Sequence, residues 1–175
     1  MNWYTILILV VGIIALVYVF GLMITLGFVV TFKRKLNEHS RAIVIVLNQK
    51  KEALINLVEI IEKNGLKLDP KYLVLLRDID VNSFERIYST ESKKSRETLS
   101  YVKQELLSIA NKSVDFKKNE EYKLASSLLI SLDEQFRFLV ATYNADVIGY
   151  NYWIRFKPYG YIFLLNKTEN KDIIS

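Results

Sequence analysis

"WYTILILVVGIIALVYVFGLMITLGFVVTF", residues 3–32, decides the fold, because it holds no charged residue and no histidine over its whole length. As a helix it would be about 45 Å long at about 1.5 Å per residue, and the hydrocarbon core of a bilayer is about 30 Å thick. A buried helix of a soluble protein is seldom uncharged over such a length. We therefore expect residues 1–32 to be a transmembrane anchor, with residues 3–32 in contact with the lipid bilayer.

The first charged residues after this run are Lys33, Arg34 and Lys35, whereas the other end offers only the amino terminus. Basic residues flank the cytoplasmic end of a membrane span. A cleaved signal peptide does not fit, because no basic residue precedes the run and no small-residue cleavage site follows it. We expect a single-pass protein with its N-terminus outside the cell and its C-terminal domain in the cytoplasm. The absence of cysteine agrees with this location, because cytoplasmic domains need no disulfides.

All 24 basic and 19 acidic side chains follow the apolar run, and the net charge is +5. The inner leaflet of a cell membrane is anionic, and each cation near its surface contributes about 1 kcal/mol of attraction. We therefore expect the positive charge to face the anionic lipids of the inner leaflet, and we do not expect the protein to bind nucleic acid. The basic residues on the helix that leaves the membrane are Lys33, Arg34, Lys35, Arg41, Lys50 and Lys51.

Apolar residues recur at three- and four-residue steps through most of the remaining chain, which is typical of amphipathic helices. The first helix continues the span and ends at Asn64-Gly65, since glycine readily takes the left-handed conformation at a helix end. A short helix follows, with Asp69 as N-cap and Pro70 at its first position. The apolar stripe of the first helix consists of Ile43, Leu47, Leu54, Leu57, Val58 and Ile61.

Two further helices are expected after the short one. The first should begin near Asn82 or Ser83 and run to about Asn111; its polar centre, residues 89–100, is either a solvated face or a break, and we favour a continuous helix. The last should have about 35 residues. The predicted stripe of that helix is Tyr122, Ala125, Leu129, Leu132, Phe136, Leu139, Tyr143, Val147, Tyr150 and Ile154.

These helices predict an all-α fold: one N-terminal transmembrane helix, followed by an antiparallel bundle of three long helices and one short helix, because short connections join neighbouring helices. We assign residues 1–32 to the anchor, 33–160 to a cytoplasmic helical bundle and 161–175 to a C-terminal tail. The polar end of that tail is expected to be frayed.

Groups for catalysis are scarce. The chain has no cysteine, its one histidine is His39, and its six glycines form no phosphate-binding loop. Glu59 with Glu62, and Asp133 with Glu134, are carboxylate pairs that we interpret as solvated helix faces. The sequence therefore predicts no catalytic residue, no metal site and no cofactor.

The dipeptide Tyr-Asn occurs at Tyr143-Asn144 and again at Tyr150-Asn151, with Pro158 further on. This spacing resembles the C-terminal helix of the LemA family of membrane-anchored bacterial proteins. Asn56-Leu57-Val58-Glu59 is similar to that family's Pro-Asn-Leu-Val-Glu, and Asn119-Glu120 with Tyr122 is similar to its Asn-Glu-x-Phe. The departures are Ile55 for a proline, Ser40 for a tryptophan, Val140 for an arginine, and Lys157 for the phenylalanine before Pro158.

The resemblance implies an antiparallel helical bundle on the cytoplasmic side of a bacterial cell membrane. The family has no established biochemical activity, so the resemblance implies no reaction. Our leading hypothesis is that the bundle binds an unidentified membrane or cytoplasmic protein, or organises a membrane complex. A lipid or envelope-stress sensor that reads anionic lipids through Lys33, Arg34, Lys35, Lys50 and Lys51 is a second hypothesis. An enzyme that uses carboxylates, or Tyr143 and Tyr150, is a third.

The Tyr-Asn pairs have a structural interpretation that we prefer to a ligand site. Tyr143 and Tyr150 belong to the apolar stripe and should be buried near one end of the core. Asn144 and Asn151 follow one position round the helix, where an amide could bond to a neighbouring helix and fix its register.

Overall fold

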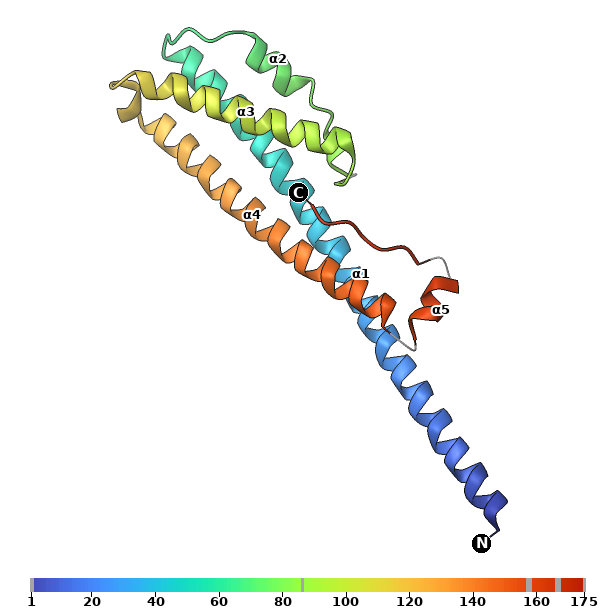
Figure 1. Ribbon diagram of the computed structural model, residues 1–175. Helices are drawn as coiled ribbons and strands as arrows, with labels where there is room; N and C mark the ends of the chain where they lie inside the picture. The colour runs from blue at the N-terminus through green and yellow to red at the C-terminus, as the bar shows by residue number, and fades with distance from the viewer. Residues whose placement is uncertain (1, 86, 157–158, 166–167, 175) are drawn as a thin grey trace. The chain divides into compact units, whose positions relative to one another are not determined.

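The computed structural model describes residues 2–174 apart from 86, 157–158 and 166–167, so Pro158 of the predicted motif lies outside the described residues. The described residues are helical and contain no strand, which confirms the all-α prediction. The elements in chain order are α1 (Trp3–Lys63), α2 (Lys71–Arg77), the 3₁₀ helix η1 (Val81–Glu85), α3 (Thr90–Lys112), the 3₁₀ helix η2 (Phe116–Lys118), α4 (Glu120–Arg155) and α5 (Gly160–Leu165) (Figure 1).

Helix α1 has 61 residues and is the one helix in the described part of the chain that is long and apolar enough to cross a membrane. Every side chain from residue 3 to residue 20 is exposed. The prediction that the apolar run continues into the first amphipathic helix is confirmed. The predicted end of this helix at Asn64-Gly65 is also confirmed, because Lys63 is the last helical residue and Gly65 has a φ of +76°.

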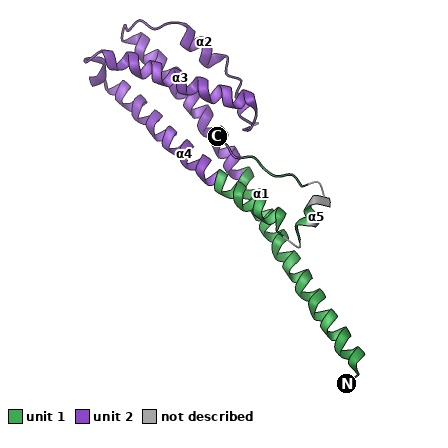
Figure 2. Cartoon of the chain, in the orientation of Figure 1, with its two compact units in different colours: residues 1–37, 144–172 green, residues 38–143, 173–175 purple. Residues whose placement is uncertain are grey.

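The chain forms two compact units (Figure 2). Unit 1 consists of residues 1–37 and 144–172, and unit 2 of residues 38–143 and 173–175. Each unit contains one part of α1 and one part of α4. The division of the sequence at residues 32 and 160 remains a prediction, because compactness alone does not show where an anchor ends.

Much of the core of unit 2 is aliphatic and comes from the predicted stripes, although Phe84 and Tyr143 are also buried in it and Phe136 and Leu139 of the predicted α4 stripe are only half-buried. The six stripe residues of α1 are each at most 1% exposed. Leu99, Val102 and Leu106 of α3 are fully buried, as is Leu129 of α4. Each such side chain contributes about 1.5–3 kcal/mol when it leaves water. The periodicity therefore identified many of the residues that stabilise this unit.

The predicted start of the third helix near Asn82 or Ser83 is wrong. Residues 81–85 form η1 instead, and α3 begins at Thr90 with Ser89 as its N-cap. The Ser89 hydroxyl accepts a hydrogen bond from the backbone N–H of Ser92 at 3.0 Å. That bond satisfies one of the free N–H groups that open a helix. From Thr90 to Lys112 the helix is unbroken, so the polar centre does not interrupt it.

Helix α4 has 36 residues, against about 35 predicted, but the region after it differs from the prediction. Helix α5 (Gly160–Leu165) begins at the last residue assigned to the bundle and occupies the start of the segment assigned to the tail. Further on, Lys171 is bonded through its backbone to the side chain of Asn151. The expectation of a frayed tail is therefore wrong at Lys171, because a side chain of α4 satisfies its backbone groups.

Candidate functional site

An open groove runs between α1 and α4 in unit 2, and we call it the α1–α4 groove. It consists of two adjoining hollows of about 470 Å³ and about 550 Å³, which share Asn56 and Leu128. Ala53 and Ala125 form much of its floor, and both are buried. Small side chains in the floor let another chain approach the backbone of both helices closely.

Exposed leucines stand on the α4 side of this groove. Leu124 is 70% exposed and Leu128 is 49% exposed, although both belong to a helix whose opposite face is buried. Leu124 and Leu128 are four residues apart, so they lie on one face of the helix. A groove with apolar side chains at this spacing is suited to the apolar face of another helix.

The α1 side of the groove is acidic. Glu52 and Glu59 are exposed on it, and Lys63 at its end forms an ion pair with Glu121 at 3.1 Å. The rim therefore carries a net negative charge, in a chain whose overall charge is +5. A partner with basic residues beside its apolar face would be complementary to it.

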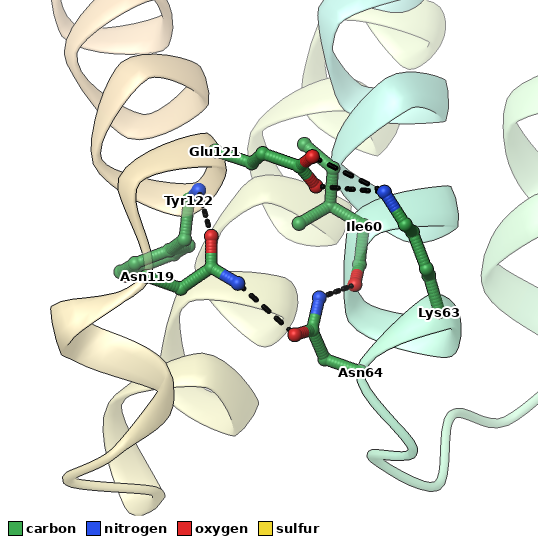
Figure 3. Close-up of polar contacts among 6 residues, drawn as sticks. All are labelled: Ile60, Lys63, Asn64, Asn119, Glu121 and Tyr122. Carbon is green, nitrogen blue, oxygen red and sulfur yellow. Dashed lines mark hydrogen bonds and ion pairs between the residues drawn. The ribbon is translucent and has the colours of Figure 1, made fainter.

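Figure 3 shows how the end of α1 is fastened to the start of α4 beside the groove. Asn64 donates to the carbonyl of Ile60 at 2.7 Å and accepts from the amide of Asn119 at 3.0 Å. The Asn119 side chain in turn accepts from the backbone N–H of Tyr122 at 3.2 Å, which is N-cap geometry. One pair of asparagines thus terminates α1, starts α4 and fixes their mutual position.

The predicted motif residues divide between the core and the groove. Leu57 and Val58 are buried in the core of unit 2, at 0% and 1% exposure. Asn56 and Glu59 line the groove. Glu62 is exposed, so the Glu59 and Glu62 pair is a solvated face as expected.

An ion cluster that the sequence analysis missed joins three helices of unit 2, with Lys50 buried and both Asp133 and Lys103 half-buried. Asp133 of α4 pairs with Lys50 of α1 at 2.5 Å and also with Lys103 of α3. The Lys50 side chain is only 8% exposed, and its ammonium group also lies 5.7 Å from the centre of the Phe136 ring. Burial alone raises the pKa of the Asp133 carboxyl, but the hydrogen bonds from Lys103 and Lys50 outweigh it and hold that pKa below its usual value.

This cluster corrects two interpretations. Asp133 was taken with Glu134 as part of a solvated face, yet it is the centre of the cluster. Lys50 was counted among the cations that face the membrane, but its charge is used inside unit 2. The same holds for Lys51, whose ammonium group donates to the carbonyl of Ile79 at 2.7 Å.

Spacing could have identified the cluster. Lys50 lies three residues after Leu47 and four before Leu54, so it occupies a position of the apolar stripe. Lys103 lies four residues after Leu99 and three before Leu106, and Asp133 lies four after Leu129 and three before Phe136. A charged residue at a stripe position is buried with its helix face and therefore needs a partner of opposite charge.

The tyrosines of the Tyr-Asn motif are buried, as predicted. Tyr143 is 1% exposed, and its ring centre lies 5.9 Å from that of Tyr88 within unit 2. Tyr150 is 3% exposed in unit 1. Neither tyrosine lines the α1–α4 groove.

Within the described residues, Asn151 forms its hydrogen bonds with the segment after α5 and not with a neighbouring helix as predicted. Its amide donates to the backbone carbonyl of Lys171 and accepts from the backbone N–H of the same residue, both at 2.9 Å. Asn144 also makes a contact, so it too is engaged. Asn151 therefore holds the segment after α5 against α4.

The membrane-flanking basic residues Lys33, Arg34 and Lys35 are all exposed on α1. The ammonium group of Lys35 lies 5.7 Å from the centre of the Phe32 ring. Within the described residues, no group of three or more acidic or histidine side chains is arranged to hold a metal ion.

Comparison with known proteins found no matching family model, no matching curated protein and no matching solved structure.

Proposed function

We propose that this chain is a single-pass membrane protein whose unit 2 is an antiparallel helical bundle that binds an amphipathic helix of another protein in the α1–α4 groove. The exposed leucines Leu124 and Leu128 carry the proposal. An apolar side chain that remains in water on a surface groove is typical of a contact site. With a LemA-like layout, the protein would serve as a scaffold at the membrane of a bacterial cell.

The order of contacts along the helices supports the antiparallel arrangement. Lys63, at the end of α1, contacts Glu121, at the start of α4. Lys50, earlier in α1, contacts Asp133, later in α4. The residue numbers of the contacting pairs therefore increase along α1 while they decrease along α4, as they do in an antiparallel pair of helices.

The uniformly exposed apolar face of α1 supports the anchor, because lipid is the solvent in which such a face is stable. The exposed cations Lys33, Arg34 and Lys35 at its end favour an N-terminus outside the cell and a cytoplasmic unit 2. Protease added to intact cells should then spare unit 2 and should degrade it only after the membrane is permeabilised. Cleavage in intact cells would reverse the orientation.

The chemistry of the groove defines the partner helix. Its apolar residues should recur at three- and four-residue steps to cover Leu124 and Leu128. Its flank should carry lysine or arginine to face Glu52 and Glu59. Lys63 does not repel such a partner strongly, because Glu121 already neutralises it.

A photo-crosslinking amino acid at position 128 of the full chain, expressed in cells, tests the groove. We expect a discrete crosslinked product with one protein. Ile130 is the matched control site, because it is also an exposed apolar residue of α4, at 55%, but lies on another face of the helix. Position 130 should give no such product.

Charge reversal then tests the predicted chemistry. Glu52→Lys with Glu59→Lys should abolish the product at position 128, whereas Glu134→Lys, on an exposed part of α4, should leave it unchanged. The same product from positions 128 and 130, or one that survives the double reversal, would contradict binding in the groove.

A further inference from the structure

Aromatic residues from the C-terminal end of α4 and from the segment that follows it contact the apolar part of α1 within unit 1. We call Tyr152, Trp153, Phe156 and Tyr159 the aromatic cluster. The Trp153 ring stacks on Phe28 of α1, with centres 4.4 Å apart and planes inclined by 8°. The Tyr159 ring lies 5.0 Å from that of Tyr18, and Phe156 lies between the two contacts.

The position of Tyr18 within the apolar run fixes the depth of these contacts. A span needs about 20 apolar residues to cross the hydrocarbon core. Any stretch of about that length within residues 3–32 contains Tyr18 and Gly21. Whichever part of the run crosses the bilayer, the residue that touches Tyr18 lies at a depth that lipid occupies.

Glycine makes the close approach feasible. A β-carbon at Gly21 would overlap the ring of Tyr159, and one at Gly149 would lie 2.6 Å from an atom of the Phe32 ring. The two segments therefore touch where one of them lacks a side chain. A β-carbon at either of the other two glycines of the apolar run, Gly12 and Gly27, would meet nothing within 4 Å.

Polar contacts hold the chain where it leaves and rejoins α4. The Arg155 side chain donates a hydrogen bond to the side chain of Asn170 at 3.0 Å. This bond lies next to the two hydrogen bonds between Asn151 and the backbone of Lys171. Between these contacts, residues 156–165 contain Lys157 as their one charged residue. An apolar, aromatic stretch of sequence between polar contacts is the pattern of a segment that enters a membrane interface.

From this geometry we propose that the aromatic cluster lies against the anchor within the bilayer, and that its partner is the lipids. Tyr152 and Trp153 lie at the boundary between headgroups and acyl chains, and Tyr159 lies about 15 Å deeper, because Tyr18 precedes Phe28 by ten residues of helix. Tyr and Trp are enriched at the boundary because the rings are apolar and carry a polar group. Tyr152 is 57% exposed and faces that environment. The inference rests on the proposed anchor, and it adds a second membrane contact from the other end of the chain.

The chain has two tryptophans, Trp3 and Trp153, which makes the test direct. Trp3→Phe leaves Trp153 as the one indole, and Trp153→Phe leaves Trp3. Each full-length variant is reconstituted in phosphatidylcholine vesicles whose acyl chains carry bromine either near the headgroup or near the chain end. Bromine near the headgroup should remove about half of the Trp153 emission, and bromine near the chain end should remove less.

The Trp3 variant separates the inference from the anchor. Quenching of Trp3 with unchanged emission from Trp153 would overturn the inference and leave the anchor standing. If neither indole is quenched, the anchor fails and the inference fails with it.

A second probe does not depend on indole stacking. The chain has no cysteine, so Tyr152→Cys and Glu134→Cys each provide a unique site for a spin label on α4. The label at position 152 should collide with oxygen, which dissolves in lipid, more often than with a water-soluble nickel chelate. The label at position 134 should show the reverse. Equal preference for the nickel chelate at both positions would overturn the inference.

Discussion

The two parts of α1 pack against their neighbours in different ways. Residues 3–32 are apolar on every side and largely exposed, and their contacts in unit 1 are aromatic rings seated on glycine. Residues 38–63 bury one aliphatic stripe, and that stripe is interrupted by Lys50, which pairs with Asp133. One continuous helix thus changes its mode of packing where its surroundings change.

The difference shows which contacts can set the position of a helix. Under the proposed anchor, a charge within the apolar run would lie in the hydrocarbon core and cost about 3 kcal/mol, so the run would rely on the shape of rings and glycines. In unit 2, ammonium groups can be buried if a carboxylate meets them. We therefore expect substitutions of charge to act most strongly in unit 2, and substitutions of shape in unit 1.

Asp133→Asn should have the largest effect. It keeps the shape of the side chain but leaves Lys50 and Lys103 close together without their counter-charge. Removal of one partner of a fully buried ion pair costs about 3 kcal/mol or more, and since the Asp133 side chain is 20% exposed we expect a loss of at most about 3 kcal/mol. Urea unfolding of the full chain in lipid nanodiscs, followed by far-ultraviolet circular dichroism, should show this loss in the free energy of unfolding.

Glu134→Gln is the matched control, because Glu134 is the adjacent carboxylate on α4 and is exposed. Its effect should stay within about 0.5 kcal/mol. Equal losses for the two variants would remove the distinction between the ion cluster and the solvated face.

Protonation of Asp133 in acid should lower the free energy of unfolding of the wild type, by no more than Asp133→Asn does. The pKa of Asp133 is lower in the folded chain than in the unfolded chain, where it is about 3.9. The cluster therefore stabilises unit 2 fully above about pH 5, and this contribution is lost as the pH falls through the folded pKa, because the unfolded state binds the proton more readily. Unfolding free energies measured at descending pH should converge for the wild type and Asp133→Asn, and parallel curves would exclude the cluster as the cause.

Gly149→Leu tests packing by shape in unit 1. The new side chain would occupy the place of the Phe32 ring, and overpacking of this kind costs about 1–3 kcal/mol. Separation of the two segments should also expose Trp153 from its stack on Phe28 and shift its emission to the red in the Trp3→Phe background.

A compensating change sharpens this test. Phe32→Ala combined with Gly149→Leu should restore much of the Trp153 spectrum, because the smaller residue leaves room for leucine. Gly12→Leu should change nothing, since Gly12 has no neighbour within 4 Å. An unaltered spectrum in Gly149→Leu would show that the contact with Phe32 does not position α4.

Periodicity predicted the helices and the aliphatic core, because a repeat of three and four residues directly reflects which face of a helix is buried. It misplaced the start of α3, since Asn82, Ser83 and Ser89 are all good N-caps and only the fold selects among them. It missed the groove altogether. Leu124 and Leu128 lie one position before the stripe residues Ala125 and Leu129, so the pattern places them outside the core. It does not show that a groove lies beside them, because that depends on the packing of α1 against α4.

Asn119→Ala should destabilise unit 2 by about 1 kcal/mol through loss of the α4 N-cap. It also removes the hydrogen bond to Asn64, so the end of α1 should fray. Asn119→Asp retains the cap oxygen but loses the donor to Asn64. Amide exchange at Tyr122 should therefore increase in the alanine variant only, and an equal increase in both variants would contradict the N-cap role.

The smallest effect is expected from Asn151→Leu. Its two hydrogen bonds join an exposed backbone segment, and leucine is the better helix former, so the free energy of unfolding should change by no more than about 0.5 kcal/mol. The local result should be clear, because release of the segment raises amide exchange at Lys171 by about tenfold. Asn151→Asp keeps the oxygen that accepts from the Lys171 N–H, so it should show a smaller increase. A large loss of global stability in Asn151→Leu would instead mean that a polar contact determines the packing of unit 1, and the contrast between shape in unit 1 and charge in unit 2 would no longer hold.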